Sequence, residues 1–167
     1  MSGMLFDTGA QKSALISQCR RYRYNLTRTW DPSNRPICWI MLNPSTADAE
    51  TDDRTISKIC RFSRSWGAGG IVVVNLFALR STDPDRLYET ADRVGPLNDI
   101  EIMRAISGAS RIIAAWGCDG ALGNRDRDVL AMLRGRMVEC LVRTKGGHPG
   151  HPLYIQETTQ PFPLEAA

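Results

Sequence analysis

Amide and imidazole side chains are the groups of this chain with the clearest capacity for chemistry. Asn43 ends one apolar run, Asn75 ends a run of one Ile and three Val, and His148 and His151 share a loop rich in Gly and Pro. An Asn side chain donates and accepts hydrogen bonds, so it can orient a water molecule or bind an amide edge. A histidine at a strand end can donate to a developing anion or to a phosphate. The pattern favours binding of a polar ligand.

Ordinary structural roles remain open for the same residues. Asn43 precedes a proline, as many turn-forming asparagines do. The two histidines can be polar loop residues stiffened by Pro149 and Pro152. Three aspartates follow the first apolar run, Asp48, Asp52 and Asp53. They could act as a base or bind a metal, or they can cap a helix or face solvent.

Several common chemistries have no sequence support here. The chain has no phosphate-binding P-loop, no G-x-G-x-x-G after the first strand, no G-x-S-x-G and no H-E-x-x-H. Its five cysteines are dispersed and form no C-x-x-C pair, which is typical of reduced, packed thiols. We therefore expect neither a metal nor another cofactor.

Strands and helices alternate along the chain in a way that would gather the asparagines and histidines. Short apolar runs predict strands and amphipathic segments predict helices. The predicted strands after the first apolar run at 37–42 are 71–77, 111–117 and 138–142, and the predicted helices are 56–66, a short one within 85–92, 100–107 and 125–136. This order predicts a three-layer α/β/α sandwich with a central, mainly parallel, four-stranded sheet, whose strands end at one edge.

The segment before the first apolar run predicts an N-terminal hairpin or edge strand. Residues 21–30 alternate with period two and should pair with the strand at 37, while 11–20 could be a short helix or a loop. The alternation places Tyr22, Tyr24 and Leu26 on one face and the arginines on the other. Arg and Tyr interleaved in this way can bind a nucleic acid backbone and base, although they also protect sheet edges.

Composition indicates one domain over residues 1–167, with a core at about 20–155 and loose termini. The first eleven residues lack a signal-peptide pattern and no apolar run is long enough to span a membrane, so a cytoplasmic location is expected. The net charge is +3, with six basic residues against one acidic residue in 11–36. A basic segment of this kind can attract phosphates, or it can be a solvated face.

Four motifs resemble a bacterial and phage family catalogued only as a domain of unknown function. They are MLNPSTAD at 41–48, VVVNLFALR at 72–80, AWG at 115–117 and HPGHPLY at 148–154. The same four places are more distantly similar to the uracil-DNA glycosylase superfamily. That resemblance implies that Asn43 positions the attacking water, that Asn75 reads the base edge and that His148 stabilises the departing base.

The resemblance leads to a specific functional hypothesis. We expect an N-glycosidic hydrolase or base-recognising enzyme acting on nucleic acid or a nucleotide. The catalytic residues would be Asn43 and His148; the substrate-binding residues would be Pro44, Ser45, Thr46, Asp48, Asn75, Trp116, Gly117, His151 and Tyr154; and the nucleic-acid contacts would be Arg21, Arg23 and Lys145. The alternative is a non-catalytic binding module that uses the Arg and Tyr side chains of residues 21–24. A small-molecule phosphotransfer or hydrolytic enzyme is a weaker third class, because the phosphate loop is missing.

Overall fold

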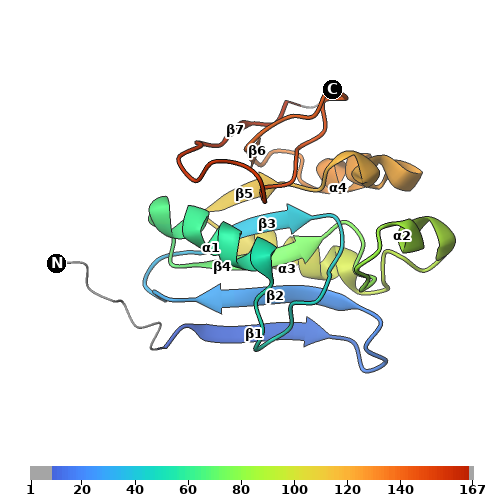
Figure 1. Cartoon of the computed structure of the whole chain (residues 1–167), viewed down its shortest axis with the longest axis horizontal. Coiled ribbons are helices and arrows are strands. Elements are labelled where there is room, and N and C mark those ends of the chain that lie inside the picture. Colours follow the sequence, from blue (N-terminus) through green and yellow to red (C-terminus); the bar gives the residue numbers. More distant parts are fainter. Residues whose placement is uncertain (1–8, 166–167) are drawn as a thin grey trace.

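The computed structural model describes residues 9–165, which form a mixed sheet of seven strands with helices on both faces (Figure 1). The sheet order is β1-β2-β4-β3-β5-β6-β7. The elements in chain order are β1 Gln11–Ile16, β2 Arg23–Thr29, β3 Ile37–Met41, α1 Arg54–Ser65, β4 Gly70–Asn75, α2 Asp85–Glu89, α3 Asn98–Gly108, β5 Arg111–Ala114, the 3₁₀ segment η1 Cys118–Asn124, α4 Arg125–Met132, β6 Val138–Cys140 and β7 Phe162–Pro163.

The four strands predicted from apolar runs lie side by side in the middle of the sheet. β4 pairs with β3, β3 with β5, and β5 with β6, and all three pairs are parallel. The sheet nevertheless has seven strands rather than the four predicted. Two strands are added at one side and one at the other, and all three added pairs are antiparallel. The described chain is therefore α/β with a larger, mixed sheet.

The expected pairing of the N-terminal strand was wrong. β2 does not pair with β3, because β4 lies between them and pairs antiparallel with β2. The hairpin is formed instead by β2 and β1, and β1 occupies the segment expected to be a helix or loop. β1 is therefore the edge strand, and β2 is paired with a strand on each side, β1 and β4.

A bulge in β2 changes which side chains share a face. The β1–β2 register shifts between Leu15 and Ile16, so that Tyr24 has no partner in the pairing. Tyr22 and Tyr24 pack on the face that carries α3 and α4, but Leu26 packs under α1. The simple alternation expected from the sequence, with Leu26 beside the tyrosines, was wrong because an extra residue inverts the pattern.

Two apolar clusters hold the helices on opposite faces of the sheet. On one face, α1 packs Ile59 and Phe62 against Trp39, whose Nε1 donates to Ser63 Oγ at 2.9 Å. The other cluster joins α2, α3 and α4 to the opposite side chains of the same strands. Asp53 caps the start of α1, and its carboxylate accepts from the Ile56 N–H at 2.9 Å.

The C-terminal segment adds a strand beyond the predicted core. β7 pairs antiparallel with β6, and Leu164 N–H donates to Val138 O at 2.8 Å. The sheet therefore extends beyond the core predicted at 20–155. The expected looseness of residues 1–8 and 166–167 falls outside the described residues. Among helices that the structure describes, none is long and apolar enough to cross a membrane.

Candidate functional site

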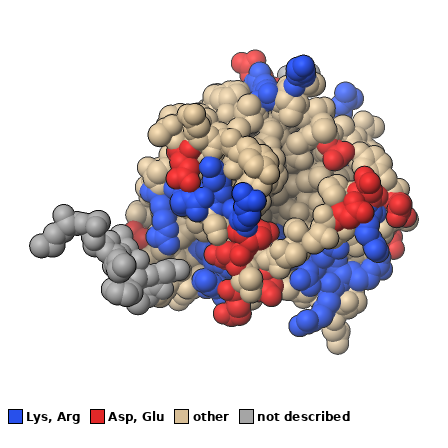
Figure 2. Space-filling model, in the orientation of Figure 1, with Lys and Arg blue, Asp and Glu red and all other residues tan. Residues whose placement is uncertain are grey.

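The four motifs meet at the carboxyl edge of the parallel strands, as the strand alternation predicts. Backbone hydrogen bonds join the strand ends: Leu42 O accepts from Phe77 N–H at 3.0 Å, and Pro149 O accepts from Gly117 N–H at 2.7 Å. Figure 2 shows the surface hollowed beside α1, over the carboxyl ends of β3 and β4, with mostly uncharged walls. Open α/β sheets bind ligands at such an edge.

Asn75 is a buried amide without a partner. Its exposed fraction is 1%, and neither Nδ2 nor Oδ1 makes a hydrogen bond. Val73, two residues before it, packs in the cluster under α1, so strand alternation directs the Asn75 side chain toward the α1 face. Leaving two polar atoms buried and unpaired costs about 1–3 kcal/mol for each group. A ligand at this edge could supply both bonds.

The backbone next to Asn75 is held from the opposite face. Asn98 Nδ2 donates to the backbone oxygens of Asn75 and Leu76 at 2.9 and 3.0 Å. Arg125 Nε donates to Leu76 O at 2.8 Å, and its Nη2 pairs with Asp99. These contacts fix the end of β4 while the Asn75 side chain remains unpaired. Sequence reasoning missed Asn98 and Arg125 in this role, because helix capping and solvent exposure explain such residues equally well.

Asn43 connects the end of β3 to the loop after β4. Its Nδ2 donates to three backbone oxygens, those of Pro44, Leu79 and Ser81, at 3.2, 3.4 and 3.0 Å. No described residue donates a hydrogen bond to its Oδ1. The amide is therefore fixed by its nitrogen, and its oxygen keeps a defined direction in which it can accept from water.

The two histidines lie toward different faces. His148 Nδ1 is 3.9 Å from Asp126 Oδ2, at the start of α4. The pKa of His151 is lowered by desolvation, and the negative charge of Asp53, at the start of α1, partly opposes this shift. His151 Nδ1 also accepts from the Leu153 N–H at 3.2 Å. His151 is consequently the histidine within electrostatic range of the start of α1, on the side where Asn75 also points, whereas the glycosylase resemblance favoured His148.

Trp116 and Gly117 follow β5. Trp116 is buried on the face opposite α1, and its indole N–H has no hydrogen-bond partner. A side chain at Gly120 would clash with this indole ring, so the turn that begins at Gly117 needs a glycine there. Trp116 thus packs against the turn that contains Gly120, and the structure does not bring it to the Asn75 side.

The remaining predicted residues lie around the edge with different exposures. Pro44 is buried, whereas Ser45 and Thr46 are exposed. Asp48 forms a turn: its Oδ1 accepts from the N–H groups of Thr51 and Glu50, which lower the pKa of its carboxyl group. The outer positions, which share exposure to solvent, are Arg21, Lys145 and Tyr154.

Residues 22–24 do not form the surface expected for nucleic-acid binding. Tyr22, Arg23 and Tyr24 are 6%, 3% and 3% exposed. The tyrosines lie in the core, so they are not available to stack on bases. Arg23 faces the α1 side instead, where its Nη1 donates to Ala47 O at 2.9 Å. No sequence signal could place it there, since the bulge that rotates this segment has no fixed motif.

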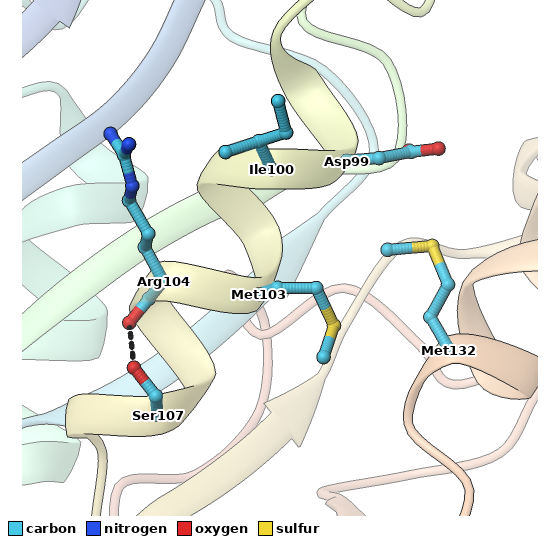
Figure 3. Close-up of a pocket in the computed structure, with 6 residues that line it drawn as sticks. All are labelled: Asp99, Ile100, Met103, Arg104, Ser107 and Met132. Atoms are coloured by element: carbon cyan, nitrogen blue, oxygen red, sulfur yellow. Dashed lines mark hydrogen bonds between the residues drawn. The ribbon is translucent and has the colours of Figure 1, made fainter.

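A separate shallow groove lies between α3 and α4 (Figure 3). Its apolar lining comes from Ile100, Met103 and Met132, and Ser107 Oγ donates to Arg104 O at 2.8 Å. The groove lies on the face of the sheet opposite α1 and offers no unpaired buried polar group, so it is not a candidate for chemistry. Among the described residues, no group of three or more His, Cys, Asp or Glu could hold a metal ion.

The chain belongs to a protein family of unknown function, DUF1643, whose model matches residues 23–153. The predicted resemblance to a domain-of-unknown-function family is thus confirmed, while the resemblance to uracil-DNA glycosylases stays a prediction. Searches of curated proteins and of solved structures gave no match.

Proposed function

We propose that this protein recognises a nucleobase, in nucleic acid or in a nucleotide, and hydrolyses its N-glycosidic bond. The observation that carries the proposal is Asn75, whose buried amide has neither donor nor acceptor satisfied. A nucleobase with adjacent C=O and N–H groups pairs with an amide in both directions at once. Binding of such a base would remove the free-energy cost of keeping the Asn75 amide buried without hydrogen bonds.

Asn43 is the proposed positioning group for water. With Nδ2 held by three backbone oxygens, its Oδ1 can accept a hydrogen bond from a water aimed at the anomeric carbon. The water oxygen bonds to that carbon as the carbon–nitrogen bond breaks, and the bonding pair leaves with the base. Because an amide does not take up a proton, the water's proton passes to the leaving base or to solvent.

A histidine of the 148–151 loop is the proposed donor to the leaving base. Neighbouring strands are about 4.8 Å apart, so β3 and β6, separated by β5, place their following loops roughly 10 Å apart. A base and its sugar fit in that span. His151 lies on the α1 side with Asn75, and the pKa of His151 is lowered, which favours the neutral imidazole, a single N–H donor. His148, beside Asp126, is the second candidate for the same role.

The test is base release from a panel of oligonucleotides and nucleotides that carry modified bases, with detection of abasic sites. We expect Asn75→Ala and Asn43→Ala to slow release at least 100-fold, and whichever histidine acts to give a comparable loss as Ala. Asn25→Ala is the matched control, because its amide lies on the opposite face, 3.5 Å from Glu101. Release that is unchanged in Asn75→Ala would contradict the proposal.

A binding protein without hydrolysis is the second candidate function, favoured by one observation. The Asn43 amide nitrogen is fully engaged in joining two loops, as a purely structural residue would be. In that case the wild-type protein binds bases through Asn75 and releases none. Equilibrium binding of the same ligands separates this outcome from the enzymatic one.

A further inference from the structure

Arg23 presents an unused pair of hydrogen-bond donors. Its side chain is 3% exposed, and Nη1 donates to Ala47 O at 2.9 Å. Nε is buried without a partner, and no hydrogen bond joins Nη2 to a described residue. The Nε–Nη2 edge holds two parallel N–H groups, the geometry with which arginine binds an oxyanion in bidentate fashion.

No described carboxylate forms an ion pair with this guanidinium. Asp53 and Asp48 act on Arg23 at longer range, where their charges favour its protonated form. Their oxygens already serve the backbone, since Asp53 accepts from Ile56 N–H and Asp48 accepts from two N–H groups of its own turn. Burial lowers the pKa of Arg23 to about 10, so the side chain still carries its charge at neutral pH.

A second positive charge stands nearby. Arg80, which is partly buried, disfavours the charged form of Arg23 electrostatically, and its backbone N–H donates to Arg21 O at 2.8 Å. This bond holds the loop after β4 against the start of β2. Two arginines that repel each other electrostatically, neither with an ion pair to any described residue, are stabilised when an anion binds near them.

Arg23 and Asn75 lie at the same end of adjacent strands and face the same side. Leu26 of β2 is paired with Val73 of β4, and both pack under α1. Arg23 follows on that face toward the strand end because of the bulge, and Asn75 follows Val73. The unused guanidinium edge and the unused amide therefore belong to one region.

We propose that the Nε–Nη2 edge of Arg23 binds a phosphate of the ligand, with Arg80 adding charge. The choice of phosphate rests on the proposed function, since a base bound at Asn75 with a phosphate at Arg23 makes the ligand a nucleotide or nucleic acid rather than a free base or nucleoside. The loop at 44–48 covers Arg23 through the Ala47 oxygen, so we expect it to shift when the phosphate enters.

The first experiment measures the thermal unfolding midpoint against inorganic phosphate at constant ionic strength, with chloride as the replacement. A ligand that binds the folded state raises this midpoint. We expect a phosphate-dependent rise in the wild type and in Arg127→Gln, an exposed site on α4 that loses the same charge. In Arg23→Gln the apparent phosphate affinity should fall at least tenfold.

The second experiment compares uridine monophosphate with uridine by calorimetry. The wild type should bind the nucleotide at least tenfold more tightly, and the ratio should approach one in Arg23→Gln. If Arg23→Gln does not fold, Arg23→Lys and Arg80→Gln replace it, and each should lose about threefold to tenfold in phosphate affinity. Arg23→Lys lacks the paired donors, and Arg80→Gln lacks the second positive charge. A single-stranded oligonucleotide as a third ligand separates a backbone phosphodiester from a terminal phosphate.

The outcomes separate the two proposals. If the phosphate effect is the same in Arg23→Gln as in the wild type, or the nucleotide binds no better than the nucleoside, the phosphate site is refuted. If the phosphate effect depends on Arg23 while Asn75→Ala changes no base preference, the phosphate site stands and the proposed base recognition falls.

Discussion

Two arginines of β2, five residues apart, are buried to the same degree but are used differently. Arg28 is 2% exposed and pairs with Asp52 at 2.8 Å, and its other nitrogens donate to the backbone oxygens of Asp48 and Thr27 at 2.7 and 2.8 Å. Arg23 is 3% exposed and donates one hydrogen bond, to Ala47 O. Arg28 is satisfied by its own chain, which is the behaviour of a structural residue. Arg23 is not, which agrees with our proposal that its remaining donors bind a ligand.

The largest effect that this contrast predicts is on stability. Arg28→Ala should lower the free energy of unfolding by about 2–4 kcal/mol, because it leaves a cavity and removes the partner of several polar groups, although the partial exposure of Asp52 limits the loss. Urea denaturation measures this change. Arg127→Ala, at an exposed position, should stay within about 0.5 kcal/mol of the wild type. A loss in Arg28→Ala no larger than that of this control would show that the network around Arg28 is not structural.

The second prediction concerns the same measurement at the other end of the strand. Arg23→Gln should cost less than Arg28→Ala, roughly 1 kcal/mol or below, because the lost hydrogen bond to Ala47 is offset by removing a buried charge that has no close carboxylate among the described residues. Urea denaturation in phosphate-free buffer tests it. If the two variants lose equal stability, Arg23 is also a structural residue and the contrast fails.

A third, smaller effect is expected from the acidic neighbour of Arg23. Asp53→Asn should strengthen phosphate binding about twofold to threefold, since it removes a negative charge that acts at the site while Asn still caps α1. The phosphate-dependent unfolding midpoint reports the change. Asp128→Asn, exposed on α4, supplies the matched loss of charge and should have no effect. Weaker phosphate binding in Asp53→Asn would mean that this carboxylate helps to hold the ligand.

The smallest predicted effect is on the titration of His151. Desolvation by the surrounding loops lowers the pKa of His151, an exposed residue, below its usual 6.5, so as the pH falls the unfolded chain takes up a proton before the folded protein does. The contribution of neutral His151 to the free energy of unfolding is therefore complete above pH 6.5 and declines as the pH falls toward the lower pKa of the folded protein. Asp53→Asn should lower the pKa of His151 further, because the charge of Asp53 opposes the effect of burial. Nuclear magnetic resonance of the imidazole protons measures it, and an increase of the pKa would contradict this assignment.

The central strands were predictable because their residues leave few alternatives. Ile71 to Val74 are β-branched and apolar on both faces, which requires burial within a parallel sheet. The outer strands gave no such signal. β1 is polar and exposed at Gln11, Lys12 and Ser13, and β7 has two residues, so both depend on pairing with a partner that the local sequence does not specify.

The candidate site likewise has residues whose positions were predictable from the sequence and residues whose positions were not. Asn43, Asn75 and the histidine loop could be placed together because strand ends in a parallel sheet share an edge. Arg23 was predicted to contact nucleic acid, but its burial on the α1 side could not be predicted, since it depends on a bulge and on the path of the loop at 44–48. Whether a polar side chain is satisfied is a property of the folded neighbourhood, and residue type alone does not determine it.

The two outer strands also affect how the molecule behaves in a crowded solution. An exposed strand edge invites other chains to pair with it, most readily where it is long, flat and apolar. At one edge, β1 carries Lys12 among other polar residues, and at the other, β7 ends after two residues at Pro163, which has no N–H to donate. Both margins of the described sheet therefore discourage growth by strand addition, and the apolar parallel strands between them are kept from aggregating through their backbones.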